Sequence, residues 1–296
     1  MPDHAYPSLT LQPIVQDDQT IGDTQILVMG FGALGAAALA HLAVRAEPGL
    51  TLLPAADTAQ LAKEALTALP SQEASPAPLL GGAHVLVLLV DESDAAQTEL
   101  ATAVASAAQG RLRLVTGVAL SDPGGLDVLM QDVAARRWSE DLAASVQHFV
   151  RLDMGADGHI PPDTSAVLQS LTADMAHLCN KQCYNGFDFE DIMTVMTTPG
   201  PLTTGIGTAS GPDRAQLAAQ RAMARTWPDC GNERPKYSVM LIIASASTNS
   251  HLAEHRYVAR AVCERLDPDQ HCLHAAIYND TLDDQLQVAL LVIPTD

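Results

Sequence analysis

Three glycines at a strand-to-helix junction are the residues of this sequence with the clearest chemical potential. They form Gly30-Phe-Gly32-Ala-Leu-Gly35, a complete G-x-G-x-x-G between an apolar run and an alanine-rich stretch. Glycines at such a junction let a phosphate approach the free N–H groups of a helix N-terminus. Asp57 follows near the end of the next apolar run, where an acid can hold a ribose hydroxyl. On these residues alone, the pattern predicts NAD binding and a nicotinamide-dependent oxidoreductase.

The same residues have a purely structural interpretation. A tight turn from strand to helix requires glycine whether or not a ligand binds, because a side chain would obstruct the turn. Asp57 can equally cap the helix that follows it. The motif by itself leaves both interpretations open.

Other groups of reactive residues point more weakly to chemistry. Cys179 and Cys183 share a helix face without a histidine pair beside them, so we expect core packing. His251 and His255 flank Glu254 but lack the H-E-x-x-H order of a zinc helix, so we expect a solvated or helix-start role. The chain has no G-x-S-x-G elbow and no lysine at P-loop spacing. We therefore predict no metal site and neither a serine hydrolase nor a P-loop kinase.

Strands and helices that alternate along the first half of the chain must position the glycine motif. Apolar runs and helical stretches alternate through the first half of the chain, which is typical of a doubly wound parallel sheet. We expect strands at 26–30, 50–54, 84–90, 112–120 and 149–154, helices at 33–46, 57–67, 94–108 and 126–146, and a loop at 68–81. A helix at 163–181 then connects the two halves, with one apolar stripe along it.

The sequence pattern of the second half predicts an α+β layer, in which helices pack on a sheet. A helix is expected from Ser210, where Ser210 and Asp213 could satisfy its first free N–H groups. The remaining elements are expected as helices at 189–197 and 251–266 and as strands near 201–210, 237–245, 272–280 and 284–294.

Composition excludes several classes of protein. The chain has 296 residues, 47% of them hydrophobic and 17% charged, which is typical of a globular protein with a packed core. Its formal net charge of −19 disfavours nucleic acid and anionic membranes as partners. Five cysteines without paired spacing favour a reducing cytoplasm, and the acidic N-terminus is unlike a signal peptide.

Two segments of the second half carry a family resemblance. GIGTASG at 205–211 is followed by DRA at 213–215, and an acid-rich turn precedes the apolar ending 280–294. With the stretch 187–225 around them, they resemble the C-terminal domain of FtsZ, the bacterial tubulin homologue that polymerises at the division site. Weaker similarity extends to 26–38, 50–61 and 82–90. The resemblance implies a tubulin-like fold, GTP or GDP as ligand, and assembly into polymers.

The sequence departs from FtsZ where the family binds phosphate. The family has a glycine- and threonine-rich loop of the form GGGTGTG, whereas residues 91–98 read DESDAAQT. Asp91, Glu92 and Asp94 would repel a triphosphate, and no Lys or Arg between Lys63 and Arg111 offsets them. The family's Asn-Asp pair for guanine falls near Ser165 and Ala166. We therefore predict a degraded nucleotide site, with no cofactor and no appreciable GTPase.

The acidic loop that follows the connecting helix is retained. In FtsZ this loop completes the active site of the neighbouring subunit, and the resemblance places its two acids at Asp188 and Asp191. Both acids could instead cap the helix that begins near residue 189. The preceding asparagine of the family corresponds either to Asn185 or to Gly186.

These observations lead to one expected function with two alternatives. We expect an extension at 1–22, a Rossmann-like domain at 23–162, a connecting helix and acidic loop at 163–186, and an FtsZ-like C-terminal domain at 187–296. The expected role is that of a structural or regulatory assembly partner of an FtsZ-like protein or of itself. The chain ends at Asp296 without the family's terminal linker, so we expect no direct membrane anchor. The alternatives are a GTP-hydrolysing polymer subunit and the NAD-dependent oxidoreductase.

Overall fold

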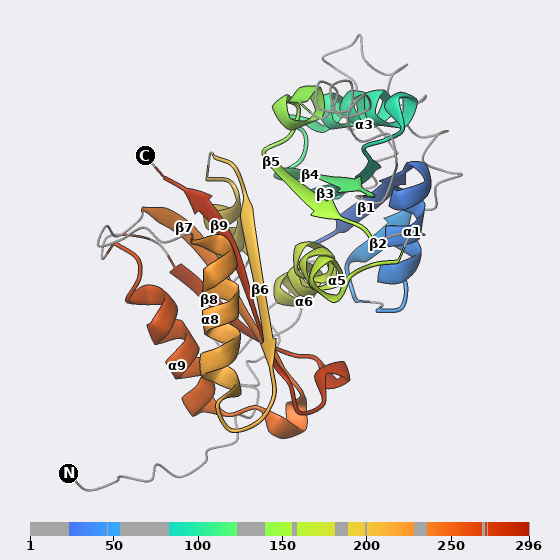
Figure 1. Cartoon of the computed structure of the whole chain (residues 1–296). Helices are drawn as coiled ribbons and strands as arrows, with labels where there is room; N and C mark the ends of the chain where they lie inside the picture. The colour runs from blue at the N-terminus through green and yellow to red at the C-terminus, as the bar shows by residue number, and fades with distance from the viewer. Residues whose placement is uncertain are drawn as a thin grey trace, which may run out of the picture. The chain divides into compact units, whose positions relative to one another are not determined.

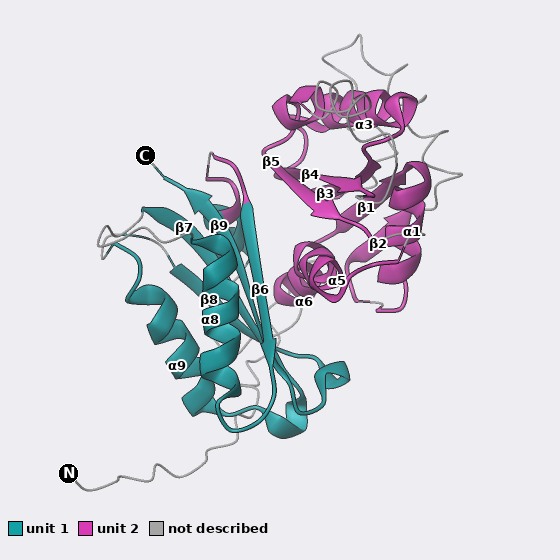
Figure 2. Ribbon diagram, viewed as in Figure 1, with its two compact units in different colours: residues 1–21, 181–195, 203–296 teal, residues 22–180, 196–202 magenta. Residues whose placement is uncertain are grey.

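The chain divides into two compact units, which are coloured separately in Figure 2. The computed structural model describes residues 24–45, 47–53, 83–122, 140–155, 159–180, 189–198, 200–227, 236–267, 270 and 272–295. The N-terminal unit comprises 22–180 with 196–202, and the C-terminal unit comprises 1–21, 181–195 and 203–296.

A five-stranded parallel sheet forms the centre of the N-terminal unit (Figure 1). Its strands lie in the order β2 (Leu50–Leu53), β1 (Ile26–Phe31), β3 (Val85–Asp91), β4 (Leu114–Ser121) and β5 (His148–Asp153). β1 and β3 are buried along their whole length, as their continuous apolar runs predict for strands covered on both faces. The predicted parallel sheet is therefore confirmed.

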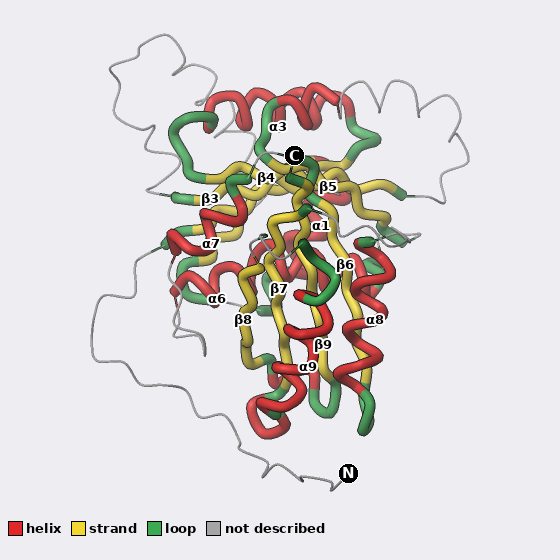
Figure 3. The backbone as a smooth tube through the Cα atoms, turned by 90° about the vertical axis from the view of Figure 1, so that its left-hand side faces the viewer, coloured by secondary structure: helices red, strands yellow, loops and turns green. Residues whose placement is uncertain are grey.

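Helices cover both faces of this sheet (Figure 3). Leu27, Met29 and Phe31 of β1 share a core with α3 (Ala95–Ala108). Gly30 faces the opposite side, where it packs against α1 (Gly32–Leu42). In the sheet, β2 lies on one side of β1, and β3, the next strand in the chain, lies on the other side of β1. The carboxyl ends of β1 and β3 therefore flank the point where the strand order reverses, which is where open α/β sheets bind ligands.

The connecting helix is interrupted, which the apolar pattern did not predict. It consists of α5 (Pro162–Gln169), a π-helical segment η2 (Ser170–Asp174) and α6 (Met175–Asn180). All residues of η2 are buried, including Ser170, Thr172 and Asp174. The Ser170 and Asp174 side chains are hydrogen bonded at 3.2 Å within this segment. The predicted apolar stripe is buried as expected.

The C-terminal unit is a four-stranded mixed sheet with two helices on one face (Figure 1). The strands lie in the order β6 (Thr203–Ala209), β9 (Leu286–Pro294), β7 (Tyr237–Ser245) and β8 (Cys272–Tyr278). α8 (Arg214–Thr226) and α9 (Leu252–Cys263) pack on this sheet, and α7 (Phe189–Met196) precedes it in the chain. The short helices η3 (Ser247–Asn249) and η4 (Asp280–Leu282) lie in the connections.

The start of α8 in the C-terminal unit corrects the sequence-based expectation. α8 begins at Arg214 rather than Ser210, and Asp213 at its start makes no side-chain cap. Gly211 has a φ of +85°, so the chain turns at residues 210–213 before the helix begins. The last two strands, β8 and β9, are not neighbours, because β9 lies between β6 and β7. No helix among the described residues has the length and apolar character needed to cross a membrane.

Candidate functional site

Close packing within the N-terminal unit accounts for two glycines of the G-x-G-x-x-G motif. A Cβ on Gly30 would lie 2.6 Å from Leu39 Cδ1 and 2.7 Å from the Gly35 carbonyl oxygen. A Cβ on Gly35 would collide with the carbonyl oxygen of Leu89 on β3. Both glycines therefore let α1 lie directly against β1 and β3, with or without a ligand.

Gly32 has a different role, because it makes room for an acidic side chain. Its φ is +75°, and a Cβ there would lie 2.5 Å from Asp91 Cβ. Asp91 is the last residue of β3 and is 5% exposed. The side chain of Asp91 occupies the space that a side chain at residue 32 would need. The glycine motif predicts a phosphate at this place.

The Asp91 carboxylate is hydrogen bonded to the N-terminus of α1. Asp91 Oδ2 accepts from the backbone N–H of Leu34 at 3.2 Å, and Oδ1 accepts from the N–H and hydroxyl of Ser93 at 3.1 and 2.6 Å. Phe31, at the N-cap position of α1, cannot supply a side-chain cap. A negative group at the first helical turn satisfies free N–H groups and interacts favourably with the helix dipole. A carboxylate from the neighbouring strand thus caps α1.

The other two acids of the loop also have partners within the chain. Asp94 caps α3, with its Oδ1 accepting from the Gln97 N–H at 3.1 Å. Glu92 forms an ion pair with Arg151 on β5 at 3.1 Å. The expectation that no cation offsets these acids is therefore wrong for Glu92. The fold brings Arg151 beside the loop from 59 residues away.

The two positions expected for guanine contacts are engaged within the N-terminal unit. Ser165 Oγ is hydrogen bonded to His41 Nε2 of α1 at 2.7 Å, and Gln169 donates to the same hydroxyl at 3.4 Å. Ala166 is buried in the core. Neither residue supplies the amide and carboxylate with which the family is expected to bind a purine.

The predicted acidic loop is only partly described. Asp191 lies exposed in the first turn of α7, which begins at Phe189 as expected. Asp188, Asn185 and Gly186 lie outside the described residues, as do Asp57, Cys183 and most of the helix expected at 126–146.

The remaining sequence candidates have structural surroundings. Cys179 is buried on α6, in agreement with core packing. His251 lies at the start of α9, but His255 is buried, with its Nε2 3.0 Å from Ser250 Oγ, so the solvated role is wrong for His255. Within the described ranges, no group of three or more His, Cys, Asp or Glu side chains is arranged to hold a metal ion.

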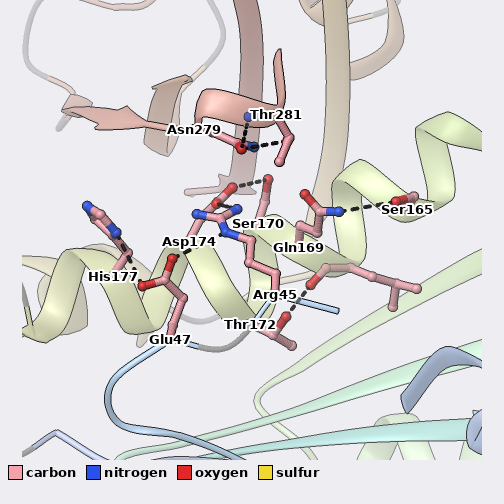
Figure 4. A network of polar contacts seen from close by, with 11 residues as sticks. Arg45, Glu47, Ser165, Gln169, Ser170, Thr172, Asp174, His177, Asn279 and Thr281 are labelled. Atoms are coloured by element: carbon pink, nitrogen blue, oxygen red, sulfur yellow. Dashed lines mark hydrogen bonds and ion pairs between the residues drawn. The ribbon is translucent and has the colours of Figure 1, made fainter. Parts of the chain in front are cut away.

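A buried ionic network beside the π-helical segment was missed from the sequence. Arg45 lies between two carboxylates, 2.5 Å from Asp174 and 3.3 Å from Glu47 (Figure 4). His177 Nδ1 lies 3.5 Å from Glu47. Burial raises the pKa of Asp174, and the nearby Arg45 opposes that rise. These residues come from the connection that follows α1 and from the connecting helix, so no local pattern links them.

Comparison with known proteins identifies relatives by sequence. No protein-family model matches the chain. It is 29% identical over 109 residues to the cell division protein FtsZ of Caulobacter vibrioides, covering 37% of this chain and 21% of that protein. It is 25% identical over 227 residues to FtsZ of Rhizobium radiobacter, covering 73% of this chain and 39% of that protein. The matched segments thus span well under half the length of these relatives.

Solved structures extend the similarity of fold to nearly the whole chain. A tryptophan-to-tyrosine variant of FtsZ from M. jannaschii matches with a TM-score of 0.68 and 18% identity, covering 92% of this chain and 91% of that one. CetZ2 from Haloferax volcanii, a protofilament with GTPγS bound, matches with a TM-score of 0.58 and 12% identity, covering 91% and 92%. The chain is thus a distant relative of FtsZ by sequence, and it shares the fold of the FtsZ and CetZ structures.

Proposed function

We propose that this chain is an FtsZ-like assembly subunit that works without bound nucleotide. The observation that carries the proposal is the Asp91 carboxylate, which accepts the Leu34 N–H at the N-terminus of α1. A phosphate bound to the same N–H groups would lie a few ångströms from this charge. At about 4 Å, each pair of like charges costs on the order of 1–4 kcal/mol in surroundings between water and a protein surface.

The geometry of the whole loop supports the same proposal. Asp91 and Asp94 each hydrogen bond to the start of a different helix, α1 and α3. The N-termini of α1 and α3 are therefore each capped by a carboxylate of the chain itself. The ion pair of Glu92 with Arg151 holds the loop toward β5. Phosphate binding would require these contacts to be exchanged for contacts with a ligand of the same sign.

The acidic loop before α7 suggests how such a subunit would take part in assembly. We propose that Asp188 and Asp191 dock against the nucleotide of a neighbouring FtsZ-like subunit. If this chain's own site cannot receive a further subunit, it would end the filament. FtsZ and CetZ structures include a dimer and a protofilament, which supports association with similar subunits. The expected compartment is the cytoplasm, where FtsZ-like partners assemble.

Calorimetric titration tests the nucleotide part of the proposal. Purified protein is titrated with GTP, GDP and NAD, each with and without Mg²⁺, and no heat of binding is expected. Micromolar GTP binding would contradict the proposal and favour the GTP-hydrolysing subunit. Micromolar NAD binding would instead favour the oxidoreductase. Asp91→Gly removes the competing carboxylate, so any gain of phosphate affinity should appear in this variant and not in Asp94→Ala.

Co-sedimentation with an FtsZ polymer from the same cell tests the assembly part. The wild-type chain is expected to join the polymer or shorten it. Asp188→Ala combined with Asp191→Ala should abolish this effect while circular dichroism remains unchanged. Glu190→Ala provides a matched control, because it removes an exposed acid of the same turn that the family resemblance does not assign to catalysis. A wild-type chain that leaves the polymer unchanged would refute the proposal.

A further inference from the structure

Two cysteine side chains of the C-terminal unit meet at the end of α9. Cys263 is the last residue of that helix and is exposed, whereas Cys272 is the first residue of β8 and is half-buried. The two thiols lie close enough for each to influence the ionisation of the other. Neither cysteine is part of a disulfide.

The surrounding backbone explains why these two residues meet. The chain turns directly after α9, where the N–H of Leu266 donates to the Cys263 carbonyl at 3.1 Å. Cys272 pairs with Val239 of β7, and paired residues of adjacent strands lie on the same face. Val239 belongs to the core beneath α8 and α9, and Cys272 packs against the same core. Cys272 therefore faces the helix whose last residue is Cys263.

We propose that Cys263 and Cys272 form a reversible thiol–disulfide pair, with a low-molecular-weight disulfide as oxidant. The product is a covalent bond between the end of α9 and the start of β8. It closes the connection 264–271. Because the two thiols are near one another at the same end of α9, a short approach brings them to the S–S bond length of about 2 Å.

The chemistry divides the roles between the two thiols. The Cys263 thiolate attacks one sulfur of the oxidant, its S–S bond breaks, and one small thiolate leaves. Cys272 then loses its proton and attacks the Cys263 sulfur of the mixed disulfide, which releases the second small thiolate. The two protein thiols lose two electrons and two protons in total, and the oxidant is reduced to two thiols.

The electrostatics fit this order of events. Interaction with the Cys272 thiol lowers the pKa of Cys263 to about 7, whereas the same interaction and burial raise the pKa of Cys272. The exposed thiol is therefore substantially ionised near neutral pH, and the thiolate is the nucleophile in this exchange. Within the described part of the chain, no third ligand joins the pair in a metal site.

Peptide mapping tests the pairing. The full chain is oxidised with glutathione disulfide, free thiols are blocked with N-ethylmaleimide, and the protein is digested with trypsin without reduction. Arg265 separates the two cysteines, so a disulfide joins peptide 261–265 to peptide 266–296. We expect this linked pair in the wild type and in Cys179→Ala, but not in Cys263→Ser. A lasting glutathione adduct on Cys263, a link to another cysteine, or no reaction would overturn the proposal.

Alkylation kinetics provide an independent measurement. The rate at which iodoacetamide modifies Cys263 should rise with a midpoint near pH 7 in the wild type. In Cys272→Ala the midpoint should move up toward the ordinary thiol value of about 8.5. An unchanged midpoint in this variant would show that the two thiols do not interact, which would contradict the proposal.

Discussion

At the level of single residues, Gly32 and Asp91 depend on each other. Gly32 lacks the Cβ that would lie 2.5 Å from Asp91 Cβ, and Asp91 uses this space to cap α1. A single change at either residue therefore affects both the turn and the helix that follows it.

Replacement of Gly32 tests this dependence. Gly32→Ala combines a left-handed backbone with a steric clash, so we expect a loss of about 2–4 kcal/mol in the free energy of unfolding. The same change should cost at least about 1 kcal/mol less in an Asp91→Gly background, because the clash is then absent. Urea unfolding of the four proteins measures the difference. Equal costs in the two backgrounds would show that the residues are independent.

Burial of His255 should make stability depend on pH. Desolvation is the main cause that lowers the pKa of His255 to about 4, with Arg214, His274 and His251 acting in the same direction and Glu254 opposing them. The unfolded chain, with a histidine pKa of about 6.5, therefore binds more protons between these values. The stabilising effect is complete above about pH 6.5 and is lost as pH falls toward 4.

The expected slope is about 1 kcal/mol per pH unit within that window. Urea unfolding at several pH values from 7 to 5 measures it, and His255→Gln should reduce the slope. Part of the slope should remain, because burial also lowers the pKa of His148. A variant with the wild-type slope would contradict the role of His255.

At the level of elements, Arg214 joins α8 to α9 and to two loops. Its guanidinium forms two hydrogen bonds with Glu254, at 2.7 and 2.8 Å, and a third with the Asp284 carbonyl at 2.7 Å. It also donates to the Asn249 carbonyl. Arg214 is 3% exposed. These contacts place the first residue of α8 and explain why the helix begins there.

Loss of this arginine should therefore be far more costly than loss of an exposed one. Arg214→Ala leaves Glu254 and two carbonyl oxygens without their partner, and we expect a destabilisation of about 3–5 kcal/mol. Arg260 pairs with Glu264 in an exposed position at the end of α9, so Arg260→Ala should leave the free energy of unfolding nearly unchanged. Denaturant unfolding of both variants distinguishes these values. Similar costs would refute the anchoring role.

Two glycines of β6 set the distance between this strand and α8. Cβ atoms on Gly205 and Gly207 of β6 would collide with the carbonyl oxygens of Ala222 and Ala218 on α8. The glycines that resemble the family motif thus have a structural role here, because they let the helix backbone lie directly on the strand.

At the level of the whole molecule, net charge is the dominant property. A formal charge of −19 on 296 residues produces repulsion between copies, which salt screens over about 8 Å at physiological ionic strength. Self-association or co-assembly must overcome this repulsion.

Added salt should therefore favour association. Static light scattering should give a strongly positive second virial coefficient at about 10 mM salt and a much smaller one at about 150 mM. The expected reason is screening of like charges rather than a change of fold, so circular dichroism should stay constant. A virial coefficient that does not change with salt would contradict this prediction.

The amino-acid sequence by itself determined the classes of element and the resemblance to FtsZ. Continuous apolar runs predicted β1 and β3, and the pattern of the second half predicted helices on a sheet. These features depend on local periodicity and short motifs, which a sequence displays directly. The predicted parallel sheet, and the FtsZ resemblance first based on residues 205–215, are confirmed.

Only the tertiary structure decided which side chains meet. The capping of α1 by Asp91 joins residues 57 positions apart, and the Arg151 ion pair with Glu92 spans 59. The pairing of Arg45 with Asp174, beside an interrupted helix, spans 129. Such contacts follow from strand order and helix placement, which bring distant residues together without any local pattern. For that reason the sequence indicated an acidic loop at the phosphate position, but only the fold showed those acids hydrogen bonded to its own helices and to Arg151.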